Sequence, residues 1–455
     1  MASFKQFIGN VKGLQYIFDQ LKVCSPLGRN LLLNTEFQTD VHLLQDELDW
    51  LGRHLDFMQQ RPYVRRPLVL LLHELNDISQ TVQNLKNLQV LDDIELFEVK
   101  KFAMASQRIR SLLGDEGYPS EGLPADLSKV VTILDPEESK IAHFYIYSAY
   151  DSRLAELRKR IEQADTIEEK EELTWQCAQI EDEIRQRLTE MLQPYWESLQ
   201  RNQHTLATID LRNAKADLAS EWGLCRPVIS NERTCYRGLF HPVLQQQMKE
   251  RGDEFQAVDI TLFTAPCLIT GANMSGKTVL LKSLSLAQHL FQFGFYVPAM
   301  EAEIRVADEV FCVIDDQQNE QKGLSSFAVE ILNINRILEF VKSGKRAFVL
   351  VDELARTTNP DEGRRLVSAF VSMMQRYQVM ALVTTHYSGV SDDCRQLRVK
   401  GLRMNELNDA ITPQNLSRYM DYSLVETDSE TVPTEALTIA RIFHADDEFL
   451  ALAEE

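Results

Sequence analysis

The chain lacks the features of membrane proteins, of secreted proteins and of cysteine-bound metal sites. No apolar run in its 455 residues approaches the ~20 residues that a membrane span needs. Residues 1–6 do not begin a signal peptide, because no basic segment is followed there by an apolar one. Seven cysteines are scattered without a Cys-x-x-Cys pair, which argues against a disulfide framework or a zinc site. We therefore expect a cytoplasmic protein without membrane attachment.

Positive charge is also scarce. Lysine and arginine total 48 against 68 aspartate and glutamate residues, so the formal charge is −20. Proteins that bind nucleic acid usually carry a basic surface, because phosphate contacts supply most of the affinity. An acidic total still permits a local basic groove, but it makes DNA a less expected partner.

The composition changes twice along the chain. Residues 1–150 carry leucines at helical spacing, and residues 152–200 are rich in Glu, Arg, Lys and Leu. The second stretch predicts a helical hairpin whose long arm starts at a capping box, Thr166 with Glu169. The hairpin is either coiled-coil-like or a solvated charged helix of a bundle. We expect a helical core at 1–150, the hairpin and a lever helix at 151–225, and an α/β domain at 226–455.

Three apolar runs in the last region predict strands, at 267–270, 347–351 and 380–384. Continuous apolar strands that alternate with helices are typical of a mostly parallel sheet with both faces covered. The expected fold class is therefore α/β, with an all-helical region followed by the sheet-containing domain.

The first of these strands leads into the pattern G-x-x-x-x-G-K-[ST] and then a helix, which is the setting that a P-loop requires. Glycines let successive N–H groups face phosphate oxygens. Lys277 supplies positive charge to the β- and γ-phosphates, and the Thr278 hydroxyl is a ligand for Mg²⁺. The sequence thus predicts an ATP and Mg²⁺ site whose nucleotide contacts are Gly271, Asn273, Met274, Ser275, Gly276, Lys277 and Thr278.

Two carboxylates, Asp352 and Glu353, follow the strand at 347–351. A P-loop fold is expected to place that strand beside the first one. We expect Asp352 to hold Mg²⁺ through water, and Glu353 to orient and polarise the attacking water. Carboxylates are common at strand ends, so this pair alone is weak evidence for an ATPase site. The phosphate loop upstream makes it strong evidence.

Two further residues have plain structural alternatives. His386 follows the strand at 380–384, where it could reach the γ-phosphate, although a buried and satisfied histidine would also fit. Ser325 precedes a predicted helix and is a good N-cap residue. A helix N-terminus is also an anion site, so Ser325 could contact phosphate.

Five strings of residues together resemble the MutS family of ATPases. They are 270–278 around the phosphate loop, 295–299 (Phe-Tyr-Val-Pro-Ala), 325–330 (Ser-Ser-Phe-Ala-Val-Glu), 351–358 (Val-Asp-Glu-Leu-Ala-Arg-Thr-Thr) and 385–387 (Thr-His-Tyr). Their order and spacing separate that family from transporter ATPases. Looser similarity at 25–32 and 194–219 to the family's helical lever extends the resemblance over nearly the whole chain.

The resemblance implies a homodimer with composite ATP sites. In the family, the helix that begins here at Ser325 completes the site of the other subunit. Phe255 falls where the family stacks an aromatic ring on adenine. The resemblance also supports catalytic roles for Lys277, Glu353 and His386.

Several differences from the MutS family concern its cargo, meaning the molecule on which the ATPase acts. The lever-like region begins within thirty residues of the start, so we expect no mismatch-reading domain before it. The chain contains no Phe-x-Glu, which is the family's mismatch wedge. The clamp that closes over DNA is reduced to the hairpin at 152–200. Thr357 and Asn359-Pro360 also differ from the usual residues after Arg356.

Two cargoes stay open at this point. Short, acidic MutS-like chains with this phosphate loop resemble the proposed reactivating ATPases of lysine 5,6-aminomutase, a cobalamin enzyme. That resemblance favours an ATP-driven switch that remodels a protein client. The alternative is a DNA-binding MutS homologue of repair or recombination that acts without mismatch reading. A scaffold that holds ATP only as a structural ligand is disfavoured, because Lys277, Asp352, Glu353 and His386 are all present.

Overall fold

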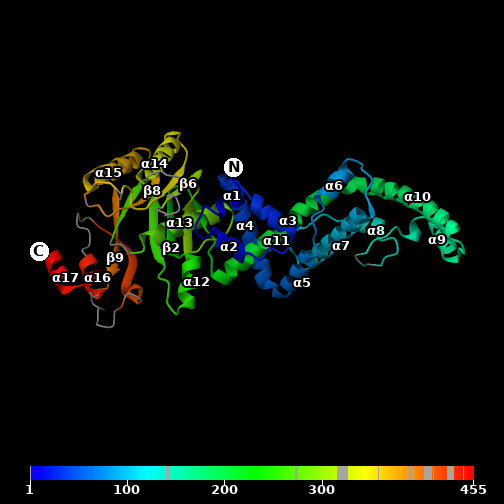
Figure 1. Ribbon diagram of the computed structural model, residues 1–455, viewed down its shortest axis with the longest axis horizontal. Coiled ribbons are helices and arrows are strands. Elements are labelled where there is room, and N and C mark those ends of the chain that lie inside the picture. The colour runs from blue at the N-terminus through cyan, green and yellow to red at the C-terminus, as the bar shows by residue number, and fades with distance from the viewer. Residues whose placement is uncertain are drawn as a thin grey trace. The chain divides into compact units, whose positions relative to one another are not determined.

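The computed structural model describes two compact units (Figure 1). The described residues are 2–139, 141, 143–271, 275–314, 326–356, 358–387, 389–390, 394–403, 412, 415–427, 435–443 and 445–454. One unit, called here the sheet unit, comprises Met1–Gln20, Glu36–Trp50 and Leu218–Glu455. The other, the helical unit, comprises Leu21–Thr35 and Leu51–Asp217. This division falls elsewhere than the boundaries at 150 and 225 that the composition suggests.

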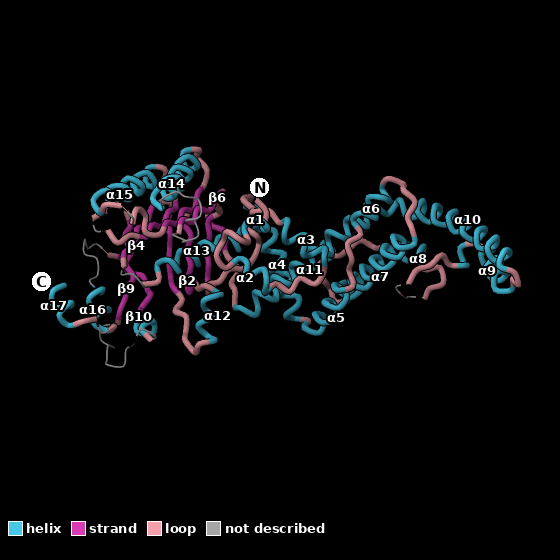
Figure 2. The backbone as a smooth tube through the Cα atoms, in the orientation of Figure 1, coloured by secondary structure: helices cyan, strands magenta, loops and turns pink. Residues whose placement is uncertain are grey.

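Helices make up the helical unit, and every strand of the described chain lies in the sheet unit (Figure 2). The helices are α3 (Pro26–Asn34), α5 (Pro62–His73), α6 (Ser79–Lys86), α7 (Asp93–Asp115), α8 (Ser128–Leu134), α9 (Ser152–Gln163) and α10 (Ile167–Leu192), with the 3₁₀ turns η1 (Ser120–Gly122), η2 (Ser148–Tyr150) and η3 (Gln193–Tyr195). Two further helices, α4 (Val41–Gln60) and α11 (Trp196–Trp222), contribute residues to both units.

The hairpin of α9 and α10 follows from its sequence. The Thr166 side chain accepts a hydrogen bond from the backbone N–H of Glu169, so the capping residues start α10 where the sequence predicts. The apolar side chains of α10 repeat at helical spacing and are buried, namely Leu173, Cys177, Ile180, Ile184, Leu188 and Leu192.

Buried polar side chains join helices of the helical unit. The Lys100 ammonium donates to Asp135 Oδ1 at 3.0 Å, to the His143 carbonyl at 2.8 Å and to Tyr147 Oη at 2.8 Å. On α11, the Asp210 carboxylate accepts from the Cys24 N–H and from both the N–H and the hydroxyl of Ser25. The Ser25 hydroxyl also accepts from the Gly28 N–H, so α11 is tied to the start of α3.

The sheet unit contains two sheets. A four-stranded sheet has the order β1 (Val228–Ser230), β5 (Glu301–Arg305), β2 (Arg233–Leu239), β3 (Val258–Phe263). A six-stranded sheet has the order β10 (Met420–Glu426), β9 (Arg395–Leu402), β4 (Pro266–Thr270), β8 (Met380–Thr384), β7 (Ala347–Val351), β6 (Glu309–Val313). In the second sheet only β10 runs antiparallel to its neighbour. The expected α/β class and mostly parallel sheet are confirmed.

The order of the central strands corrects one expectation. The runs at 267–270, 347–351 and 380–384 are β4, β7 and β8, as predicted. However, β8 pairs with both β4 and β7, so β7 does not lie beside β4. The sequence cannot reveal this order, because all three strands are short, apolar and almost wholly buried.

Helices cover both faces of the six-stranded sheet. The described helices of this unit are α1 (Phe4–Phe7), α2 (Leu14–Gln20), α12 (Pro242–Glu250), α13 (Lys277–Gln292), α14 (Ser326–Lys342), α15 (Pro360–Arg376), α16 (Glu435–Ile442) and α17 (Asp447–Glu454), with the 3₁₀ turn η6 (Leu416–Tyr419). Apolar residues of α14 and α15 share one core with β7 and β8, and the two helices lie together in Figure 1.

The first twenty residues pack against the phosphate-loop helix rather than with the helical unit. Phe7 contacts the rings of His289 and Phe293 at centroid distances of 5.1 and 5.7 Å. Phe37 contacts the same two rings. This aromatic cluster explains why the N-terminal residues belong to the sheet unit.

No helix within the described ranges is long and apolar enough to cross a membrane. None of the seven cysteines, all of which lie in the described ranges, forms a disulfide.

Candidate nucleotide-binding site

The phosphate loop joins β4 to α13, and its described residues are Gly271 and Ser275 to Thr278. Gly276 caps α13 with a φ of +83°, a left-handed conformation that favours glycine. A Cβ at this position would also lie 2.9 Å from the Tyr422 ring. Asn273 and Met274, both expected to contact the nucleotide, lie outside the described residues.

The Ser275 hydroxyl lies in the loop where a ligand could complete its hydrogen bonding. Its oxygen is buried and has no hydrogen-bond partner in the described structure. A buried hydroxyl without a partner costs free energy, so such groups are uncommon unless a ligand completes them. A bound phosphate oxygen could accept a hydrogen bond there.

Lys277 lies at the centre of the site. Its side chain is 4% exposed, and its ammonium donates to the Gly271 carbonyl at 2.8 Å. The same nitrogen is 3.9 Å from Glu353 Oε1. Burial lowers the pKa of Lys277, while the nearby carboxylates of Glu353 and Asp352 oppose that shift.

A chain of hydrogen bonds connects the loop to the ends of β7 and β8. Thr278 Oγ1 donates to Asp352 Oδ2 at 2.5 Å, and Thr384 Oγ1 donates to Asp352 Oδ1 at 2.6 Å. The Thr384 hydroxyl accepts in turn from the Glu353 N–H at 2.9 Å. Thr384, which sequence reasoning did not single out, therefore joins Asp352 to Glu353 from the intervening strand.

The turn after β7 has an unusual backbone. Glu353 has a φ of +45° and Ala355 a φ of +62°, which is a left-handed region that non-glycine residues rarely occupy. Such conformations cost about 1–3 kcal/mol each and gather at functional sites. The second carboxylate oxygen of Glu353 lies 3.3 Å from the Arg356 guanidinium.

The structure describes His386 but not Ser325. His386 is exposed, directly after β8, and its ring lies 4.2 Å from that of Tyr387, measured between centroids. The alternative of a buried histidine is therefore wrong. Ser325 lies outside the described residues, and α14 begins at Ser326.

An apolar cavity of about 220 Å³ adjoins the phosphate loop. Its lining includes Phe255, Tyr422, Met248 and Val399, together with Ser275, Gly276 and Lys277 from the loop. The Gln256 side chain donates to Asp421 and Ser423 on β10, which ties the segment carrying Phe255 to that strand. The place and apolar character of the cavity suit a nucleobase. Tyr422 lies on β10, and no sequence motif predicted that it would line this cavity.

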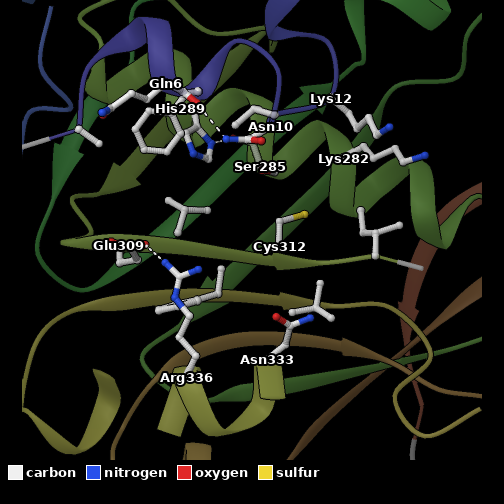
Figure 3. Close-up of a pocket in the computed structure, with 17 residues that line it drawn as sticks. Gln6, Asn10, Lys12, Lys282, Ser285, His289, Glu309, Cys312, Asn333 and Arg336 are labelled. Atoms are coloured by element: carbon white, nitrogen blue, oxygen red, sulfur yellow. Dashed lines mark hydrogen bonds and ion pairs between the residues drawn. The ribbon is translucent and has the colours of Figure 1, made fainter. Parts of the chain in front are cut away.

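A second and larger cavity, of about 570 Å³, lies along another part of α13 (Figure 3). Lys282, Ser285 and His289 of α13 line it, together with residues of β6, α14 and the N-terminal segment. In Figure 3, Arg336 reaches toward Glu309, with which it forms an ion pair at 3.0 Å. None of the described phosphate-loop residues lines this cavity, whereas Ser275, Gly276 and Lys277 line the apolar one, which therefore continues the phosphate site.

Comparison with known proteins relates residues 267–445 to a protein family. Residues 267–445 match the family model for MutS domain V. This region is therefore similar to MutS domain V. The matched residues contain the phosphate loop, both carboxylates and His386.

Curated relatives carry the same family name. An endonuclease MutS2 of Ligilactobacillus salivarius is 32% identical over 51% of this chain and 28% of its own length. An endonuclease MutS2 of Thermus thermophilus is 35% identical over 42% of this chain and 25% of its own length. A DNA mismatch repair protein MutS of Erythrobacter litoralis is 34% identical over 46% and 24%. The chain thus spans about a quarter of the length of these relatives.

Proposed function

We propose that this chain is an ATP-hydrolysing conformational switch of the MutS type. The observation that carries the proposal is the convergence of four side chains: hydrogen bonds through Thr384 join Thr278, Asp352 and Glu353, and Lys277 forms an ion pair with Glu353 at 3.9 Å. Phosphate, metal and water each have a suitable partner there. The adjoining apolar cavity leaves room for the base beside Phe255 and Tyr422.

The chemistry assigns a role to each side chain. Lys277 neutralises charge on the transferred phosphoryl group, and Glu353 accepts a hydrogen bond from the attacking water and polarises it. The strained turn at Glu353 fixes the direction of that carboxylate. His386, exposed beside the site, contacts the γ-phosphate when the nucleotide is bound.

Magnesium would be held by Thr278 through its hydroxyl and by Asp352 through water. Their oxygens lie 2.5 Å apart, and one hydroxyl with one carboxylate suits a cation that keeps water and phosphate as its remaining ligands. Within the described residues there is no cluster of three or more His, Cys, Asp or Glu side chains that could hold a metal without a nucleotide. Mg²⁺ would therefore bind with ATP, and it supplies charge neutralisation.

Steady-state ATP hydrolysis tests this proposal. Wild-type protein should hydrolyse ATP only with Mg²⁺, Lys277→Ala should abolish hydrolysis, and Glu353→Ala should bind ATP but turn over slowly. Normal turnover in either variant would disprove the assignment.

We further propose a homodimer with two composite sites, in which Ser325 acts on the ATP of the other subunit. Mixing Ser325→Arg chains with Lys277→Ala chains should restore activity, because the heterodimer keeps one site with both residues intact. Full activity of a monomer at high dilution would contradict composite sites.

For the cargo we propose DNA first. The names of the relatives favour it, since they are a mismatch repair protein and endonucleases of the MutS2 type. A protein client, such as a cobalamin-dependent aminomutase, is the second candidate. In the α9–α10 hairpin, Arg153 and Arg158 form ion pairs at 2.8 Å with Glu183 and Glu181, so these cations already have acidic partners. That mixed charge suits a protein surface better than a phosphate track.

The cargo test measures ATP hydrolysis with homoduplex DNA, four-way-junction DNA or a purified aminomutase. Stimulation by DNA, with nanomolar and structure-selective binding at about 150 mM salt, is the result expected for DNA. Stimulation by the aminomutase, with DNA affinity that collapses as salt rises, would favour the protein client instead.

A further inference from the structure

The Tyr387 side chain packs with three parts of the sheet unit, namely the turn after β7, helix α14 and helix α15. Its side chain is 8% exposed and belongs to the apolar core that contains Leu354 of the turn after β7, Ile337 of α14 and Val367 of α15. Its backbone N–H donates to Thr385 Oγ1 at 3.0 Å, which fixes where the ring leaves the end of β8. The phosphate contacts proposed above do not use this side chain.

The hydroxyl of Tyr387 holds the strained turn. It donates to the Ala355 carbonyl at 2.8 Å, in a buried position. Ala355 is one of the two left-handed residues of that turn, and Glu353 is the other. A conformation of this kind persists only where surrounding contacts impose it, and this hydrogen bond is such a contact.

The neighbouring helix leaves space for the hydroxyl. A Cβ on Gly363 of α15 would lie 2.3 Å from Tyr387 Oη and 2.7 Å from Cζ. Glycine weakens a helix relative to alanine, so its presence in α15 has a local cost. The space that this glycine leaves is filled by the tyrosine hydroxyl.

We propose that Tyr387 is a positioning residue for ATP hydrolysis: through its bond to Ala355 it holds the turn that aims the Glu353 carboxylate. Its ring also packs against the ring of His386 at 4.2 Å, so one side chain contacts both loops that border the γ-phosphate position. Burial raises the pKa of Tyr387, and the negative charge of Glu330 on α14 adds to that shift. The inference rests on the proposed ATPase function.

Single-turnover hydrolysis of ATP by Tyr387→Phe tests the proposal. The ring that fills the core remains, and only the hydroxyl is lost. Loss of one buried hydrogen bond should slow hydrolysis by about tenfold, while ATP affinity stays within about twofold of wild type. Tyr150→Phe is the matched control, because Tyr150 Oη donates to the Ile133 carbonyl at the same 2.8 Å in the helical unit. That variant should hydrolyse ATP at the wild-type rate.

A double-mutant comparison separates positioning from general stability. If Tyr387 acts through Glu353, the Phe substitution should have no further effect in a Glu353→Gln background. Gly363→Ala, which displaces the hydroxyl, should reproduce the slow hydrolysis. An equal loss with and without the Glu353 carboxylate, or an unchanged rate in Tyr387→Phe, would overturn the inference alone. Absence of hydrolysis in wild-type protein would instead disprove the proposed function, and this inference with it.

Discussion

Lys100 of the helical unit and Lys277 of the sheet unit are both buried, but the polar groups around them differ. In the helical unit, Lys100 donates to three oxygens at 2.8–3.0 Å, which matches the three protons of an ammonium group. In the sheet unit, Lys277 donates to the Gly271 carbonyl and lies 3.9 Å from Glu353. Beside it are a buried hydroxyl without a partner, at Ser275, and two left-handed residues.

This difference distinguishes a polar network that stabilises a fold from one that awaits a ligand. Fully satisfied networks make a fold rigid, whereas unmet hydrogen bonds and backbone strain cost stability unless they serve binding or catalysis. By this criterion the Lys100 network stabilises the fold, and the phosphate loop with its facing turn is the reactive part.

Replacing both lysines by methionine gives the largest expected contrast. Lys277→Met should reduce ATP hydrolysis by at least ~10²-fold, because phosphate loses its charged partner, with little change in stability. Lys100→Met should lower the free energy of unfolding by about 3–5 kcal/mol, because the buried Asp135 carboxylate loses its cationic partner.

Hydrolysis assays and urea unfolding of each variant check this contrast. Lys100→Met should still bind ATP at a temperature where it is folded. If Lys277→Met proved as destabilising as Lys100→Met, the distinction between the two networks would be wrong.

Acid should destabilise the sheet unit selectively. Burial lowers the pKa of His241 and of His289 from 6.5 to about 4. Between these pH values the unfolded chain takes up protons that the folded chain does not, so stability falls as pH falls through that window. The expected loss at about pH 5 is about 2 kcal/mol for each histidine.

Urea unfolding from pH 7 downward measures this loss. In His289→Gln, unfolding should take up one proton fewer in this pH window, so the free energy of unfolding should fall less steeply as the pH falls. This holds whatever the stability of the variant at neutral pH. An unchanged pH dependence would mean that His289 is not the acid-sensitive group.

The apolar cavity should contribute to binding rather than to the chemical step. Phe255→Ala should raise KM for ATP by about tenfold with little change in kcat, because stacking of a base on an aromatic ring is worth about 1–3 kcal/mol. Phe263→Ala, on β3 and outside the cavity lining, is the control. A loss of kcat in Phe255→Ala would place that ring in the chemistry instead.

The smallest effect is expected in the hairpin of the helical unit. Thr166→Ala removes the cap of α10 and should cost about 1 kcal/mol of stability, as N-cap losses usually do. ATP hydrolysis without cargo should be unchanged. Thermal unfolding and the steady-state assay measure both, and a lower basal rate would show that the hairpin influences the site even when empty.

Local patterns predicted the strands and the phosphate loop but not the contacts that complete the site. The runs at 267–270, 347–351 and 380–384 appear as strands because each is continuously apolar. Thr384 and Tyr422 could not be found this way, since each gains its place only when a distant strand pairs beside the loop. The packing of Phe7 on α13 could not be predicted either, because the helical pattern of the first residues does not show which element they pack against.

The most direct test of the ATPase assignment is single-turnover hydrolysis by Glu353→Gln beside wild-type protein, with ATP binding measured on the same samples. The variant keeps the size and nearly the shape of the side chain but loses its negative charge. The account predicts ATP binding close to wild type and hydrolysis slower by at least ~10²-fold, because the attacking water loses its general base. Hydrolysis at the wild-type rate would contradict it.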